Sequence, residues 1–311
     1  MKTKAIILLN LVLIISLFCA ASTVSAKTNF CRKTSQTAMQ SCQTAARSDY
    51  QLAVGTCDNF SDPVARKACQ QQASADRKDA LKTCKDQYGA RQAVCQRLAG
   101  APYDPTIDPA NFVATIDNPY FPLTPGTLFI YEGQTAQGLE HEEFFVTFNT
   151  RVILGVTCIE VRDRSWVNGE LTEDTRDYHA QDKDGNVWYF GENATQIVGG
   201  LIVGVEGSWT GGVDGAHPGI IMEAHPAIGD FYRQEFLVGT AEDMAEVLSL
   251  TESVPASYCS LGNCLKTKET SPLEPDALEN KYYAPGIGNV RTVDLITGEI
   301  LDLISITPPG P

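Results

Sequence analysis

The sequence lacks the short motifs that mark the commonest catalytic and nucleotide-binding sites. It contains no G-x-S-x-G nucleophile elbow and no glycine-rich phosphate loop with its lysine. Only 4 of its 311 residues are histidine, and none lies in an H-E-x-x-H zinc motif. His217 and His225, with Glu223 nearby, are a weak alternative metal set, because their spacing matches no known motif. These absences argue against a nucleophile-elbow hydrolase, a phosphate-loop protein and a helical zinc protease.

Long hydrophobic runs are almost absent as well. The run from Ala5 to Ala20 follows Met-Lys-Thr-Lys and is followed by the small-residue site Val24-Ser25-Ala26. This pattern predicts a signal peptide over residues 1–26 and a secreted or periplasmic protein. Cys19 is a weak candidate lipid acceptor, because the bulky Phe18 precedes it. No other segment is apolar enough to span a membrane, so the sequence predicts no transmembrane span in the mature chain.

Basic residues are scarce in most of the chain, which has 24 Lys and Arg against 38 Asp and Glu. Residues 27–98 hold 12 basic and 6 acidic residues, whereas residues 99–311 carry a net charge of −22. The acidic part argues against nucleic-acid binding, because phosphate contacts dominate that affinity. The basic part is predicted to meet an anionic surface or its own acidic neighbour. Two ordinary solvated surfaces are the alternative.

Cysteine is abundant in one segment. Six cysteines follow one another at spacings of 11, 15, 12, 15 and 11, a series that reads the same in both directions. An antiparallel pair requires this symmetry, which selects three of the possible pairs: Cys31–Cys95, Cys42–Cys84 and Cys57–Cys69. The segment is polar without strand alternation and has few large apolar residues. Residues 27–98 are therefore predicted to form a helical hairpin, with arms over 29–55 and 63–98, stabilised by roughly 2–4 kcal/mol per disulfide. Zinc is disfavoured in this segment, because no C-x₂₋₄-C knuckle occurs among these six cysteines.

The remainder divides into a linker and a β region. Residues 99–125 contain six prolines and are predicted to be an extended linker. Residues 126–311 form the predicted acidic all-β domain, an antiparallel meander that closes into a sandwich or partial barrel. Its predicted strands cover 127–132, 143–149, 155–163, 187–191, 231–238, 246–252 and 299–306, and 240–250 is ambiguous between helix and strand. The predicted fold class is therefore α+β.

Three further cysteines lie in the β region. Cys259 and Cys264 flank a plausible hairpin turn and are the favoured pair, which leaves Cys158 as a buried thiol. A Cys158–Cys264 bridge is the alternative.

Four segments of the β region carry a resemblance: Tyr178–Glu192, Gly212–Ala216, Ala241–Asp243 and Lys281–Gly288. They resemble segments of an uncharacterised family of secreted bacterial proteins with a Cys-rich helical hairpin and an all-β domain. The resemblance implies a fold class and a compartment, and it implies no mechanism.

An alternating polar segment is the best candidate for a binding site. Glu173, Thr175, Asp177, His179 and Gln181 would share one face of a strand. A charged edge strand is the favoured interpretation, and a polar face that lines a site is the alternative. The predicted ligand-binding residues are Glu173, Asp177, His179, Trp188 and Trp209. The tryptophans belong to an aromatic set that suits a core better than a pocket.

The turn Asp182-Lys-Asp-Gly-Asn186 is similar in composition to a calcium loop. It is too short for an EF-hand and lacks the closing glutamate, so a simple turn is favoured. If calcium is a cofactor, Asp182, Asp184 and Asn186 are its predicted oxygen ligands.

The sequence therefore predicts an exported, non-enzymatic binding or interaction module. It does not identify the ligand, for which a divalent cation and a small apolar molecule are the candidates. The alternative is a carboxylate-dependent secreted hydrolase that uses Asp177, Asp182 and Glu235. Close, buried carboxylates in one cleft would favour the hydrolase, and carboxylates scattered over solvated edges would favour the binding module.

Overall fold

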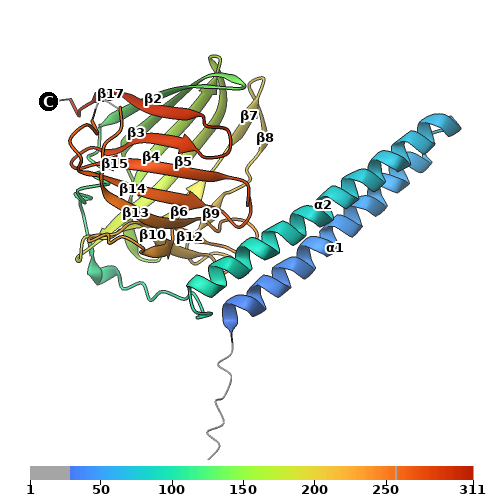
Figure 1. Ribbon diagram of the computed structural model, residues 1–311, viewed down its shortest axis with the longest axis horizontal. Helices are drawn as coiled ribbons and strands as arrows, with labels where there is room; N and C mark the ends of the chain where they lie inside the picture. Colours follow the sequence, from blue (N-terminus) through green and yellow to red (C-terminus); the bar gives the residue numbers. More distant parts are fainter. Residues whose placement is uncertain (1–28, 256–257, 311) are drawn as a thin grey trace, which may run out of the picture.

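A computed structural model describes residues 29–255 and 258–310, and it shows a helical hairpin followed by an antiparallel β barrel (Figure 1). The predicted signal peptide and Cys19 lie outside the described residues. The α+β fold class is confirmed, and the β domain is a nearly closed barrel. Among the described helices, none is both long and apolar enough to cross a membrane.

The hairpin consists of α1 (Phe30–Asp58) and α2 (Pro63–Arg97), which lie side by side and project away from the barrel (Figure 1). Asp62 caps α2 by accepting hydrogen bonds from the backbone N–H groups of Val64 and Ala65, and Pro63 occupies the first helical position. The first helix ends at Asp58, three residues beyond the predicted Gly55, and Gly55 lies within its last turn.

All three predicted interhelical disulfides are present, with Cα–Cα distances of 5.5 Å for Cys31–Cys95, 5.7 Å for Cys42–Cys84 and 5.5 Å for Cys57–Cys69. Cys259 bonds Cys264, and Cys158 is a buried free thiol. Disulfides of this number are typical of an oxidising compartment outside the cytoplasm.

Two ion pairs join the basic hairpin to the acidic barrel. The buried guanidinium of Arg91 on α2 donates to both carboxylate oxygens of Glu242, at 2.8 and 2.7 Å. Arg97 forms a second, more exposed bidentate pair with Glu246, at 2.6 and 2.9 Å. Opposite charges on the two parts of the chain therefore meet at the base of the hairpin.

The segment after the hairpin follows the barrel wall rather than hanging free. It holds a short 3₁₀ helix, η1 (Pro109–Asn111), and the two-residue strand β1 (Phe112–Val113). Strand β1 pairs with the end of β5 (Glu170–Asp182), at Asp182 and Gln181. The amide oxygen of Gln181 accepts hydrogen bonds from the backbone N–H groups of Asp117 and Asn118, which fixes the chain where it enters the barrel.

The barrel strands run in sequence order around most of the wall. They are β2 (Leu128–Thr135), β3 (Gly138–Ile153), β4 (Val156–Val167), β5 (Glu170–Asp182), β6 (Val187–Asn193), β7 (Gln196–Val198), β8 (Leu201–Gly204), β9 (Trp209–Thr210), β10 (His217–Met222), β11 (Phe231–Arg233), β12 (Glu235–Phe236), β13 (Met244–Glu252), β14 (Cys264–Thr270), β15 (Leu278–Ala284), β16 (Gly288–Asp294) and β17 (Ile300–Thr307). The ambiguous segment 240–250 is thus largely strand. Apolar residues lie on both faces of β13, and Met244, Ala245 and Val247 are buried.

Closure depends on two contacts between distant strands. β17 pairs with β2, and β10 pairs with β6 on one side and β12 on the other. Gly219 allows β10 to lie close to the chain between β11 and β12, because a Cβ atom there would lie 2.4 Å from the carbonyl carbon of Gln234 and 2.5 Å from the carbonyl oxygen of Arg233. Bulky inward residues such as Phe129, Val161 and Leu265 then fill one part of the interior.

The favoured edge-strand interpretation of residues 173–181 is wrong. These residues belong to β5, which pairs with β4 along one edge and with β6 along the other. The polar face of an interior strand cannot be explained as protection of an exposed edge, and part of it faces a cavity.

Candidate functional site

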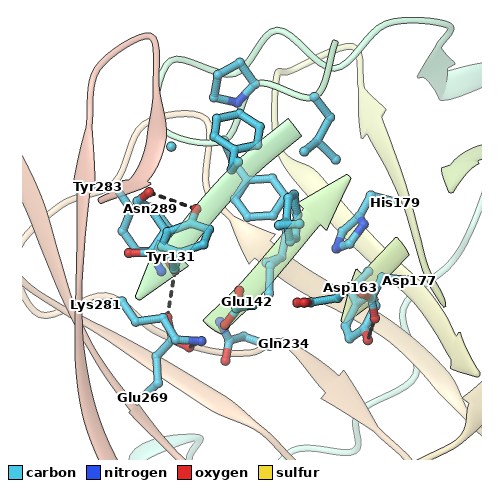
Figure 2. Close-up of a pocket in the computed structure, with 18 of the residues that line it drawn as sticks. Tyr131, Glu142, Asp163, Asp177, His179, Gln234, Glu269, Lys281, Tyr283 and Asn289 are labelled. Carbon is cyan, nitrogen blue, oxygen red and sulfur yellow. Dashed lines mark hydrogen bonds and ion pairs between the residues drawn. The ribbon is translucent and has the colours of Figure 1, made fainter. Parts of the chain in front are cut away.

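A cavity of about 260 Å³ occupies the barrel interior. Its lining is divided between apolar groups and ionisable groups (Figure 2). The apolar part comes from the segment that follows the hairpin and from the strands near it: Phe121, Pro122, Leu123, Phe129, Phe144, Ile221 and Ile287. The acidic part holds seven carboxylates: Glu142, Asp163, Asp177, Glu192, Glu235, Asp243 and Glu269.

The acidic part reaches the protein surface. Glu192, Glu235, Asp243 and Glu269 also line an adjacent hollow of about 310 Å³, whose lining includes the exposed Glu274. A ligand that enters by this route meets acidic side chains before it meets the apolar part of the cavity.

One carboxylate is neutralised by a lysine. Lys281 Nζ lies 2.9 Å from Glu269 Oε2, and the hydroxyls of Tyr283 and Thr267 donate to Glu269 Oε1 at 2.9 and 3.0 Å. Burial opposes ionisation of Glu269, but Lys281 and these hydrogen bonds together lower its pKa. Glu269 and Lys281 therefore form a satisfied ion pair on one wall, opposite Asp163, Asp177 and His179 (Figure 2).

Two further carboxylates share one phenol. The hydroxyl of Tyr189 lies 2.6 Å from Asp177 Oδ1 and 3.1 Å from Glu192 Oε2. Burial raises the pKa of Asp177 to about 7 and that of Glu192 to about 8. Because a phenol has one proton to donate, it cannot donate fully to both ionised groups. One of the two carboxyls is therefore favoured in its protonated form near neutral pH.

A second acidic pair lies on β3 and β4. Burial raises the pKa of Glu142 to about 7 and that of Asp163 well above its usual range. Among the described residues, Asp163 Oδ1 has no hydrogen-bond partner. Burial without a partner is costly for a carboxylate oxygen, so this acceptor is available to a ligand.

Two nearly inaccessible side chains also present unused polar atoms to the cavity. His179 and Gln234 are each only 4% exposed, and within the described part of the chain neither His179 Nδ1 nor Gln234 Nε2 has a partner. Burial lowers the pKa of His179 to about 3, so its ring is neutral. The ring stacks on Tyr189 with centroids 4.9 Å apart, which holds it in place. Buried polar atoms normally have partners, so these two point to a missing ligand or water.

The structure brings together some of the predicted site residues. Asp177, His179 and Glu235 line the cavity, whereas Glu173 lies on the same face of β5 but outside the lining. Trp209 is outside the lining and packs edge-on against Tyr189, with ring centroids 5.3 Å apart. Trp188 packs against Phe112 on the other side of the sheet.

Asp182 lies at the end of β5, away from the cavity lining, and its carboxylate accepts three hydrogen bonds. The donors are the backbone N–H and side-chain amide of Asn186 and the indole N–H of Trp188, each at 2.9 Å. Asn186 Oδ1 in turn accepts from the backbone N–H of Ala224, and Asp184 is exposed. In residues 29–255 and 258–310, no group of three or more His, Cys, Asp or Glu is placed to hold a metal ion. Hydrogen bonds thus explain the turn without an ion, and the calcium site remains a prediction.

Sequence reasoning missed Glu142, Asp163, Glu269 and Lys281 as members of one site. Each lies in phase with inward apolar residues of its own strand, as Glu142 does with Phe144 and Val146 on β3. The sequence feature that could have identified these residues is a charged side chain on the same face of a strand as the buried apolar side chains. That feature could be interpreted only after the pairing of the strands showed which face of each strand lies inside the barrel.

Comparisons with known proteins give little guidance. No protein-family model matches the chain, and no curated protein matches it. The resemblance to a family of secreted bacterial proteins therefore remains a prediction. Among solved structures, the chain is similar to a "putative lipoprotein" from Parabacteroides distasonis, with 14% identity over 63% of this chain and 100% of that chain, at a TM-score of 0.32.

Proposed function

We propose that this protein is an exported, non-enzymatic binding protein whose barrel cavity takes a small organic cation with an apolar part. The observation that supports the proposal is the division of one cavity into an apolar region and a region of carboxylates, among them the buried Asp177 and Glu235, that have no cationic partner among the described residues. Lys281 pairs with Glu269, and the six other carboxylates in the lining have no basic partner within the described part of the chain. A protonated amine would supply the missing charge, because ionised carboxylates are strong acceptors for charged N–H donors.

The unused atoms of His179, Gln234 and Asp163 support a ligand with hydrogen-bonding groups at its polar end. The apolar residues 121–123 support a hydrocarbon or aromatic body at the other end. The cavity volume of about 260 Å³ limits the ligand to a small molecule. The disulfides and the predicted signal peptide support export.

The head-group preference tests this function. We expect hexylamine to bind more tightly than hexanol, and hexanoate to bind weakest, because the three share a chain and differ in charge. Calorimetric titration should show the amine weakened roughly 10- to 100-fold by Asp177→Asn or Glu235→Gln, the loss expected for a charge-assisted contact. Glu170→Gln is the matched control, because Glu170 is an exposed residue at the start of β5. Equal binding of the three compounds, or tightest binding of hexanoate, would refute a cation site.

A carboxylate-dependent hydrolase is the second candidate. Asp177 and Glu235 are buried in one cavity, as that hypothesis requires, and the pKa of Asp177, raised to about 7 by burial, suits acid–base chemistry. Asp182, its third predicted residue, lies outside the lining with its carboxylate fully hydrogen-bonded. Hydrolysis of 4-nitrophenyl esters or glycosides that is lost in both Asp177→Asn and Glu235→Gln would favour the enzyme.

A further inference from the structure

Arg233 is a buried cation on the outside of the barrel wall. Along β11 and the residue after it, Tyr232 packs against the core and Gln234 lines the barrel cavity, while Arg233 between them lies at the hairpin side. Only 7% of Arg233 is exposed, and its Nε has no hydrogen-bond partner among the described residues. Its guanidinium lies 4.2 Å from the ring centroid of Phe236, and Nη1 donates a weak hydrogen bond to Met244 Sδ at 3.7 Å, which leaves Nε unused.

The charges around Arg233 do not balance. Glu242, the carboxylate that lines the same cavity as Arg233, already accepts three hydrogen bonds from Arg91 and one from the backbone N–H of Gly239. Arg91, Glu242 and Arg233 are all at least nine-tenths buried, so two cations share one carboxylate. A buried arrangement of this kind favours an additional anion.

The three residues line a second cavity of about 180 Å³, between the base of the hairpin, the chain around Tyr103 and the barrel wall. Its other walls are largely apolar and include Phe30, Val94, Phe236 and Val238. This cavity lies on the opposite face of β11 from Gln234, so it is separate from the barrel cavity.

We propose that this cavity binds a small organic carboxylate, with its anionic group on Arg233 and its apolar part against Phe236 and Val94. The planar guanidinium fork matches the geometry of a carboxylate. The surplus of one positive charge favours a monoanion over a doubly charged phosphate. The apolar walls favour a carboxylate that has a short hydrocarbon or aromatic body over a bare inorganic anion.

Calorimetric titration of the full chain with benzoate, benzamide and inorganic phosphate tests the site. We expect benzoate to bind, and benzamide and phosphate to bind at least roughly tenfold more weakly, since one lacks charge and the other lacks an apolar part. Arg233→Met should weaken benzoate roughly 10- to 100-fold, and Arg233→Lys should lose part of that affinity because it keeps the charge without the fork. Arg47→Met is the matched control, because Arg47 is exposed on α1 outside the cavity.

Benzoate binding in the second cavity should also be independent of substitutions in the barrel cavity. Asp177→Asn should leave benzoate binding unchanged, because Asp177 lines only the barrel cavity. If Arg233→Met does not fold, the Arg233→Lys variant and the benzoate–benzamide comparison in the unmodified protein still decide the question. Phosphate that binds as tightly as benzoate, or benzoate binding that is unaffected in Arg233→Lys and Arg233→Met, would overturn the proposal.

Discussion

Raising the pH from about 6.5 to about 8.5 is expected to lower the stability of the ligand-free protein by roughly 2–4 kcal/mol, or about 4–12 °C in Tm. Burial raises the pKa of Glu142 and Asp177 to about 7 and that of Glu192 to about 8. In the unfolded chain such groups ionise near about pH 4. The folded state therefore holds more protons in this range, so its free energy of unfolding falls as the pH rises.

Neighbouring groups do not reverse the sign. The buried His179 stabilises the folded state as the pH rises, because its folded pKa is lowered to about 3, but only about 0.4 kcal/mol of this contribution is left to gain above its ordinary value of 6.5. Glu269, with a lowered pKa, is already ionised beside Lys281 throughout the range. Between about pH 6.5 and 8.5, the change in the free energy of unfolding therefore comes mainly from the carboxylates with raised pKa values.

Thermal unfolding across this range checks the expectation, with Asp177→Asn expected to give a flatter profile because one buried titrating group is gone. Glu170→Gln, which also replaces a carboxylate by an amide but at an exposed position, should leave the dependence of Tm on pH unchanged. A melting temperature that stays level or increases up to about pH 8.5 would mean that the cavity carboxylates are ionised and solvated.

The second large effect is expected at the contact between hairpin and barrel. Glu242→Gln should cost about 3–5 kcal/mol, because it leaves Arg91 buried without its bidentate partner. Arg91→Met should cost less than Glu242→Gln, since Glu242 can then interact with the nearby Arg233, whereas Glu242→Gln leaves two unpaired buried cations. Without Arg233 the two single variants would be expected to cost similar amounts.

Denaturant unfolding of both single variants and the double variant measures this contact. The double variant should cost less than the sum of the single ones, as expected for a coupled pair. The exposed Lys82–Asp86 pair within α2 is the control, and Asp86→Asn should cost at most about 1 kcal/mol. Equal small losses for Glu242→Gln and Asp86→Asn would show that the hairpin is not anchored at Arg91.

The hairpin could be predicted because the spacing of its cysteines along the sequence determines how they pair. The symmetric spacing from Cys31 to Cys95 permits an antiparallel register without further information, and Asp62-Pro63 marks the start of the second helix. The barrel was predictable only as a class. Its closure depends on contacts between distant strands, such as β17 against β2 and β10 against β6, which no local pattern specifies.

The candidate site could be predicted in part for the same reason. Asp177 and His179 stand out because β5 has a polar face, but the meaning of that face depends on β4 and β6. Glu142 looks like one acid among many until its strand position places it inward. Arg233 gives no signal in the sequence, because its burial results from the docking of a hairpin more than 100 residues away.

The most direct test of the account measures the protons exchanged when an amine enters the barrel cavity. Hexylamine is titrated at about pH 7.5 in phosphate and in HEPES, whose ionisation enthalpies differ, and the difference in heat gives the protons released. The account predicts release of about half a proton or more per amine bound, because the cation favours ionisation of carboxylates that hold protons in the empty cavity. Asp177→Asn should release fewer protons. Binding without proton release, or with proton uptake, would contradict the account.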